Sequence, residues 1–77
     1  MTAEQTVRLI EWLKAKGLTD SEIVEFNSAM QAAKTPAEKQ AVIEEQKQTI
    51  VKAKKKGVAR KDVSYDLTDD EINAFYA

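Results

Sequence analysis

The side chains of this 77-residue chain that could do chemistry are mostly charged, and they gather in blocks along the sequence. Residues 1–33 carry three basic and five acidic side chains, whereas residues 34–61 carry nine basic and three acidic ones. Residues 62–77 carry five acids and no base, so the formal net charge of the whole chain is only −1. This separation of charge favours electrostatically guided binding of a partner.

The chain lacks the residue types that most enzyme sites require. It contains no histidine and no cysteine, which removes the commonest acid–base catalyst near neutral pH and the thiolate ligands of zinc sites. The serines at 21, 28 and 64 have no histidine base, and the sequence has no glycine-rich phosphate-binding loop. We therefore expect no enzymatic activity, no cofactor and no metal site.

A cluster of acids precedes the C-terminus and consists of Asp66, Asp69, Asp70 and Glu71. Such carboxylates could hold a divalent cation loosely or contact a basic surface. Acids in the first turn of a helix are also favoured by the helix macrodipole, and we prefer this second interpretation. The nearest basic target for the cluster is the chain's own stretch at 52–61.

That basic stretch resembles the core of a helix-turn-helix DNA-binding motif. From Ala53 the chain has a small residue in the first helix, Gly57 in the turn, a valine at 58 and another at 63. The resemblance implies that residues 53–66 bind DNA, with Arg60 and Lys61 early in a recognition helix and Ser64 as a further contact.

A simpler interpretation of the same stretch is a lysine-rich helix end closed by Gly57 and followed by a loop. Lys52 and Lys56 occupy positions that normally carry buried apolar side chains in the DNA-binding motif. Asp62 would bring negative charge to the DNA phosphates, which repel it. DNA binding is therefore the alternative function rather than the leading one.

Two segments of the sequence repeat each other. Residues 18–26 and 67–75 match at six of nine positions, and both resemble the entering helix of an EF-hand. Neither copy is followed by the 12-residue loop of oxygen ligands that calcium requires. We interpret the repeat as one efficient helix start that is used twice.

Aromatic side chains are the other candidates for contact with a partner. In a chain this short we expect Trp12 in the core, beside Leu9 and Leu13. Phe75 and Tyr76 lie in an amphipathic segment that docks either on its own domain or on another molecule, and the sequence leaves both alternatives open.

Helix boundaries are clearly marked. Four threonines stand three residues before a Gln or Glu, which is the capping-box pattern: Thr2, Thr19, Thr35 and Thr68. With Gly17 and Gly57 as helix ends, this pattern predicts helices at roughly 3–16, 20–33, 36–56 and 69–76. We expect an all-α fold, a small helical bundle of three main helices plus a short C-terminal helix, in a single domain. The first two helices should form an antiparallel hairpin, and residues 58–67 would add at most a short helical turn.

The third predicted helix carries few large apolar side chains. One of its faces contains Lys39, Ile43, Gln46, Ile50, Ala53 and Gly57, so that a glutamine interrupts the apolar stripe. We expect this helix to bury little and to leave much of its surface for water or a partner. The remaining core is predicted from Val7, Ile10 and Leu13 in the first helix and from Ile23, Phe26, Met30 and Ala33 in the second.

These observations predict a non-enzymatic protein-binding module, such as a small regulator, inhibitor or assembly factor, that uses a polar, charge-segregated helical surface. The sequence has no secretory signal and no apolar run of the ~18 residues that a membrane span requires. We therefore expect a cytoplasmic protein, with self-association compatible with its thin core. The residues expected to contact the partner are Gln46, Lys47, Lys52, Lys54, Lys55, Lys56, Arg60, Lys61, Phe75 and Tyr76.

Overall fold

The computed structural model describes residues 1–57 and 63–77. The described residues form four helices and no strand: α1 (Ala3–Ala15), α2 (Asp20–Ala32), α3 (Pro36–Lys56) and α4 (Asp69–Phe75). Every helix boundary lies within one residue of its predicted position, and the predicted all-α bundle is confirmed. None of these four helices is long and apolar enough to cross a membrane.

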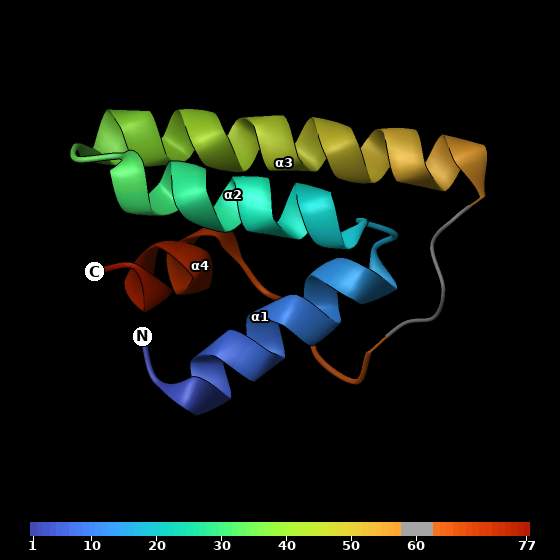
Figure 1. The fold of residues 1–77 in the computed structure, drawn as a ribbon, viewed down its shortest axis with the longest axis horizontal. Helices are drawn as coiled ribbons and strands as arrows, with labels where there is room; N and C mark the ends of the chain where they lie inside the picture. Colours follow the sequence, from blue (N-terminus) through green and yellow to red (C-terminus); the bar gives the residue numbers. More distant parts are fainter. Residues whose placement is uncertain (58–62) are drawn as a thin grey trace.

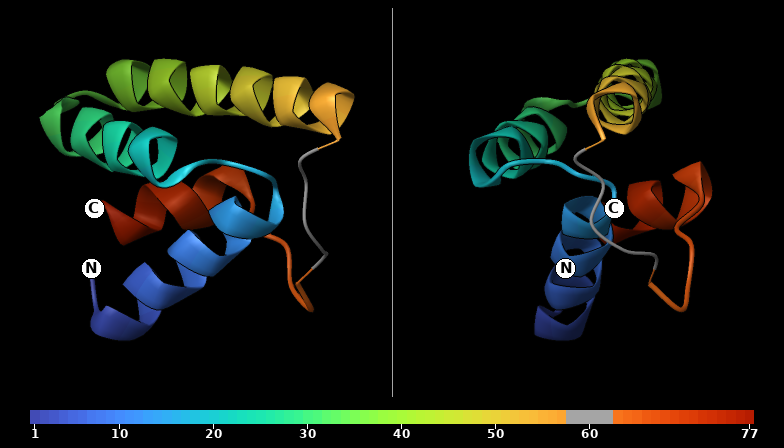
Figure 2. Two further views of the ribbon diagram at one scale, coloured as in Figure 1. Left: turned by 45° about the vertical axis from the view of Figure 1, so that its right-hand side comes forward. Right: turned by 90° about the vertical axis from the view of Figure 1, so that its right-hand side faces the viewer.

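The helices α2 and α3 lie side by side and run in opposite directions, and α3 extends past the start of α2 (Figure 1). The first helix, α1, crosses below this pair at a wide angle, whereas α4 packs against α3 and lies beside α1 (Figure 2). The chain reverses after α1 as predicted, because Gly17 adopts a φ of 96° that glycine accepts without strain. The closely aligned partner of α2 is nevertheless α3 rather than α1.

Each helix begins at a threonine whose hydroxyl accepts a backbone N–H three residues later. Complete capping boxes form at the starts of α1, α2 and α4. The predicted box at Thr35 forms only in half, because the Glu38 carboxylate accepts the backbone N–H of Lys34, at 2.8 Å, instead. Thr35 also has a more negative φ, −115°, than the other three caps.

One cluster of buried side chains joins all four helices. Its members are Leu9, Trp12, Leu13, Leu18, Ile23, Phe26, Met30, Ile43, Leu67, Ile72 and Phe75. The prediction was wrong for Val7, which is 54% exposed, whereas Ile10 is half-buried. At 100° per residue, Val7 lies on the opposite side of α1 from Leu9, and the buried face of α1 is too narrow to include both.

The third helix is fixed to the core by a few side chains. Ile43 is fully enclosed, and Gln46 and Ala53 are only 4% and 6% exposed. Val42 and Ile50 pack against the core from its edge. Ile43, Gln46 and Ala53 are the buried residues of α3, so the expectation that this helix buries little is correct, although Gln46 is enclosed rather than exposed.

Candidate functional site

The last two turns of α3 carry four exposed lysines next to an exposed valine. Val51 leaves 51% of its surface exposed, and the helix repeat places it one turn before Lys54 and Lys55. Lys52 and Lys56 are also exposed, and none of the four lysines forms an ion pair with a described residue. We call these five residues the lysine surface. An apolar side chain surrounded by polar ones is the pattern found in protein interfaces.

The helix tolerates so many like charges because they lie at its C-terminal end. There the backbone carbonyls carry partial negative charge, which basic side chains offset. Gly57 closes the helix in the left-handed region with a φ of 72°, and its N–H donates to the carbonyl of Lys54 at 3.1 Å. Because α2 begins short of this end of α3, it does not cover the last turns (Figure 1).

Lys47, which the sequence assigned to a partner, is exposed and forms an ion pair with another helix of the same molecule. Its Nζ atom lies 2.7 Å from Asp69 Oδ2 and 3.7 Å from Glu44 Oε1. The hydrogen bond to Asp69 is the largest of the effects that raise the pKa of Lys47 above its usual value. The ion pair joins α3 to the first turn of α4, so Asp69 neutralises Lys47 rather than a lysine of the 52–57 stretch.

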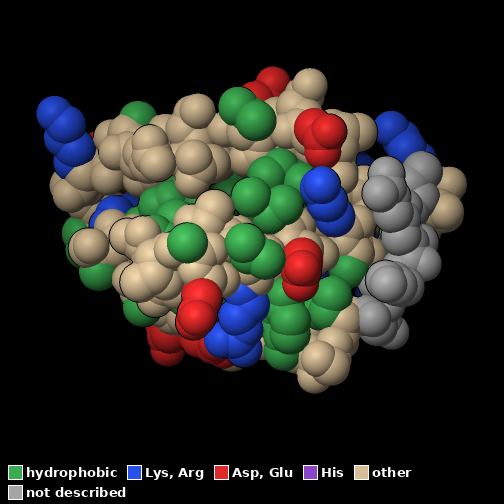
Figure 3. Space-filling model, turned by 60° about the horizontal axis from the view of Figure 1, so that its bottom comes forward, with side chains coloured by type: hydrophobic (Ala, Val, Ile, Leu, Met, Phe, Trp, Pro, Cys, Tyr) green, Lys and Arg blue, Asp and Glu red, His purple; other side chains and the backbone are tan. Residues whose placement is uncertain are grey.

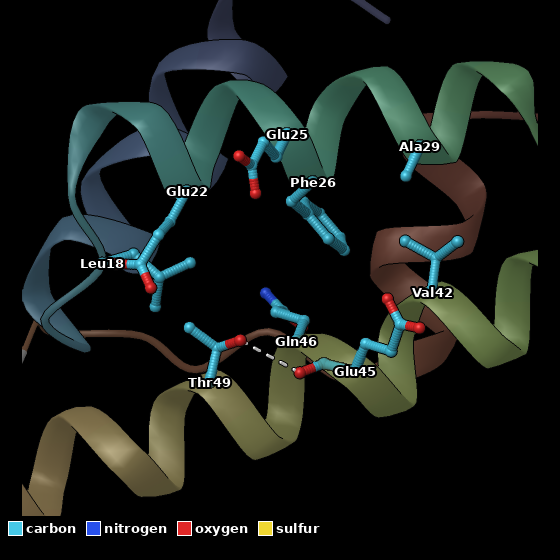
Figure 4. Close-up of a pocket in the computed structure, with 9 residues that line it drawn as sticks. All are labelled: Leu18, Glu22, Glu25, Phe26, Ala29, Val42, Glu45, Gln46 and Thr49. Atoms are coloured by element: carbon cyan, nitrogen blue, oxygen red, sulfur yellow. Dashed lines mark hydrogen bonds between the residues drawn. The ribbon is translucent and has the colours of Figure 1, made fainter.

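Gln46 lies in a groove between α2 and α3, with its side-chain amide pointing into the groove (Figure 4). The groove has a volume of about 310 Å³ and is lined by Leu18, Glu22, Glu25, Phe26, Ala29, Val42, Glu45, Gln46 and Thr49. Gln46 does not lie on the outer surface, because α2 packs across the middle of α3, and its expected contact with a partner stays a prediction. Its Nε2 atom is buried without a hydrogen-bond partner in the described part of the chain.

The C-terminal helix docks on its own domain, which decides between the two alternatives that the sequence left open. Phe75 is 7% exposed and belongs to the core, so the prediction that it contacts a partner was wrong. The Tyr76 ring meets Phe26 edge to face, with centroids 6.3 Å apart, and the Tyr76 hydroxyl donates to Asn27 Oδ1 at 2.6 Å. Burial raises the pKa of Tyr76 to about 12. Tyr76 is thus engaged inside the molecule as well.

Trp12 is 5% exposed, which confirms its predicted place in the core. Its Nε1–H donates to Asp66 Oδ1 at 2.8 Å, so this acid is tied to α1. Nearby, the Tyr65 hydroxyl donates to the carbonyl of Arg8 at 2.7 Å, and the Arg8 guanidinium lies 4.6 Å from the centre of the Tyr65 ring. These contacts fasten the segment before α4 to α1.

The segment that would carry a DNA-recognition helix is only partly described. Gly57 ends α3 as both interpretations of the basic stretch require. Residues 63–68 are not helical, so the expected recognition helix does not reach Ser64, and no helical turn forms at Tyr65. Arg60 and Lys61, which were expected to contact DNA or a partner, lie outside the described residues.

A second groove, of about 460 Å³, lies between α1 and α2 and ends at Tyr76. Most of its lining is apolar and includes the exposed side chains of Met1 and Val24. On the face of the molecule that Figure 3 presents, hydrophobic side chains are exposed near the centre and charged side chains are scattered among them. Within residues 1–57 and 63–77, no group of three or more acids is placed to hold a metal ion.

Comparisons with known protein families, with curated proteins and with solved structures found no match to this chain. Sequence reasoning identified the exposed lysines of α3 but missed the groove between α2 and α3. Glu22 and Glu25, one turn apart on α2, were a signal, but their position opposite Glu45 follows only from how the two helices pack.

Proposed function

We propose that this chain is a non-enzymatic protein-binding module, of the kind that serves as a small regulator, inhibitor or assembly factor, and that its lysine surface contacts an acidic surface of the partner. The observation that carries the proposal is the exposure of Val51 beside Lys54 and Lys55. A partner can cover the valine with an apolar side chain while its carboxylates meet the lysines.

The exposure of Val51 and of its neighbouring lysines supports a role in binding a partner rather than in holding the fold together. Removing water from an exposed valine is favourable by about 25 cal/mol per Å² of apolar area, and nothing within the described residues covers it. The lysines add long-range attraction that guides an acidic partner to this end of the molecule and weakens as salt screens it.

DNA binding through residues 53–66 is the alternative, and two observations make it the weaker one. Phosphate groups need only cations and hydrogen-bond donors, so they give no role to an exposed Val51. The recognition helix of the motif would have to include Ser64, which is not helical. The proposal therefore commits to a protein partner.

The test compares variants of exposed residues, which should fold like the wild type. Val51→Asp and the pair Lys54→Glu with Lys55→Glu change the lysine surface. Val7→Asp, at a valine of similar exposure on α1, is the matched control. Each protein is used to capture partners from an extract of the native host, the captured proteins are quantified by mass spectrometry, and the partner's affinity is then measured by calorimetry.

The proposal predicts a captured protein with an acidic surface whose affinity falls at least tenfold with Val51→Asp and with the double lysine variant, but not with Val7→Asp. A partner bound equally by all four proteins would contradict it. A parallel titration with mixed duplex DNA distinguishes the alternative. If the wild type binds DNA with a steep salt dependence and the double lysine variant loses that binding, the DNA-binding function is the correct one.

A further inference from the structure

We propose that the groove between α2 and α3 is a second binding site, which takes a lysine or arginine side chain of a partner peptide together with a neighbouring backbone carbonyl. This site lies apart from the lysine surface and has the opposite charge. It rests on three observations, which are an unpaired buried amide, three carboxylates and apolar walls of limited volume.

The first observation is the unpaired amide of Gln46. Buried side-chain amides almost always have hydrogen-bond partners, and an unpaired one destabilises the fold. Gln46 is only 4% exposed, and its Nε2 has no partner among the described residues. Its side chain points toward α2, into the space beneath Glu25 and Phe26 (Figure 4). A peptide carbonyl entering the groove would supply the acceptor that this N–H group lacks.

The second observation is the charge of the groove. Glu22 and Glu25 reach it from α2 and Glu45 from α3, and none of the three forms an ion pair with a described residue (Figure 4). One oxygen of Glu22 accepts the backbone N–H of Thr19, at 2.9 Å, so Glu25 and Glu45 are the two carboxylates without a described polar partner. Such groups favour a cation and repel a free carboxylate or phosphate.

The third observation is the shape of the groove and the nature of its walls. Leu18, Phe26 and Val42 line the groove with apolar surface, against which the aliphatic part of a lysine or arginine can pack. A volume of about 310 Å³ is near the lower end for ligand sites, enough for one long side chain with its carbonyl.

The carboxylates of the groove call for a cation, and the Gln46 N–H calls for an uncharged acceptor. The ligand must therefore carry both groups. A free amine lacks the carbonyl, and a free amino acid brings a carboxylate that Glu25 and Glu45 repel. A lysine or arginine within a peptide chain has both required groups and no negative charge. The occupant we infer is therefore a basic residue of a partner chain.

The probe for the test is a tripeptide Ala-Arg-Ala with blocked ends, titrated into the ¹⁵N-labelled full chain and followed by NMR. We expect saturable shifts of the Gln46 side-chain amide and of the backbone amides of Glu25 and Phe26. The same tripeptide with glutamate in place of arginine should produce none. Shifts that do not saturate, or equal shifts with both tripeptides, would overturn the proposal.

Variants separate the groups that carry binding. Gln46→Leu keeps the buried volume, and Glu25→Gln with Glu45→Gln changes only exposed side chains, so this pair keeps the test valid should the leucine variant misfold. Each should weaken binding of the arginine tripeptide at least fivefold, whereas the control Glu4→Gln, outside the groove, should not. Unchanged affinity in both groove variants would show that the tripeptide binds elsewhere and would overturn the proposal.

A second copy of this chain could also offer lysines to the groove, and the same spectra test for it. If the groove signals shift with protein concentration alone, and Lys54→Glu with Lys55→Glu removes that shift, the occupant is another copy and the inference of a partner peptide is wrong. Concentration-independent signals together with saturable peptide binding support the inference.

Discussion

The first half of α3 packs against α2 and α4, whereas its last two turns bury only the small side chain of Ala53. In the first half Ile43 is fully enclosed, and the ammonium group of Lys39 donates to the backbone carbonyl of Tyr76 at 3.1 Å. In the last two turns the lysines have no ion-pair partner that the structure describes. A single helix thus holds the fold at one end and presents charge at the other.

The comparison teaches that a polar helix needs few buried side chains to be fixed in place. Ile43 and Gln46, one turn apart, are buried and anchor α3 beside α2. Lys47 adds an ion pair to Asp69 of α4. At the far end only Ala53 is buried, and local effects add to it, because basic residues complement the helix dipole and Gly57 closes the last turn. Such an end can change its side chains without loss of the fold.

The largest expected effect separates the two ends directly. Ile43→Ala should lower the free energy of unfolding by about 2–5 kcal/mol, because it removes a fully enclosed side chain and leaves a cavity. Val51→Ala, the matched variant in the exposed end of α3, should change the free energy of unfolding by about 0.5 kcal/mol or less. Urea unfolding followed by circular dichroism measures both, and equal losses would contradict the division of the helix.

The next effect concerns the helix that closes on the first half of α3. The folded-state pKa of Tyr76, about 12, exceeds the ordinary tyrosine value, so the folded state keeps its proton where the unfolded state loses it. The contribution of Tyr76 to stability should therefore be fully present below about pH 10 and be lost between about pH 10 and 12. Because Tyr76 is half-exposed, the loss should be modest.

Melting temperatures across this pH range provide the measurement. Tyr76→Phe keeps the ring against Phe26 but removes the ionisable group, so its alkaline loss should be smaller than that of the wild type. Tyr65→Phe is the companion variant, since burial raises the pKa of the partly buried Tyr65 as well. An identical alkaline loss in Tyr76→Phe and in the wild type would show that the packing of Tyr76 against α2 does not keep its hydroxyl protonated.

The smallest expected effect compares one lysine from each part of α3. Lys47→Gln breaks the bond to Asp69 and should lower the melting temperature slightly at low salt and not at high salt, because salt screens exposed ion pairs. Lys54→Gln should change the melting temperature less at low salt, since no such bond is lost. If the two variants behave alike at every salt concentration, the Lys47–Asp69 pair does not hold α4 in place.

Local signals were enough to predict where the helices lie. A threonine cap, its partner three residues later and a closing glycine all act within one turn, so their effect is readable from neighbouring residues. The exposure of the lysines at 52 and 54–56 was predictable for the same reason, since they follow one another at a helix end. The half-formed capping box at Thr35 shows the limit of prediction from local signals. The Glu38 carboxylate accepts the N–H of Lys34 instead of that of Thr35, and this choice depends on the backbone before the cap.

Burial on α3 and the acidic groove could not be predicted in this way. The helix repeat did place Gln46 between Ile43 and Ile50, yet its polar amide favoured a surface position, and only the packing of α2 against α3 decides otherwise. The docking of Tyr76 on Phe26 likewise depends on a long-range contact that no sequence pattern in this chain encodes.

Hydrogen exchange of the α3 backbone amides, followed by NMR in the native state, tests the division of this helix most directly. The account predicts that the amides around Ile43 and Gln46 exchange only through global unfolding, whereas those of Lys54 to Lys56 exchange through local opening at much lower free energy. Uniform protection along the whole of α3, up to Lys56, would contradict the division into a structural half and a binding end.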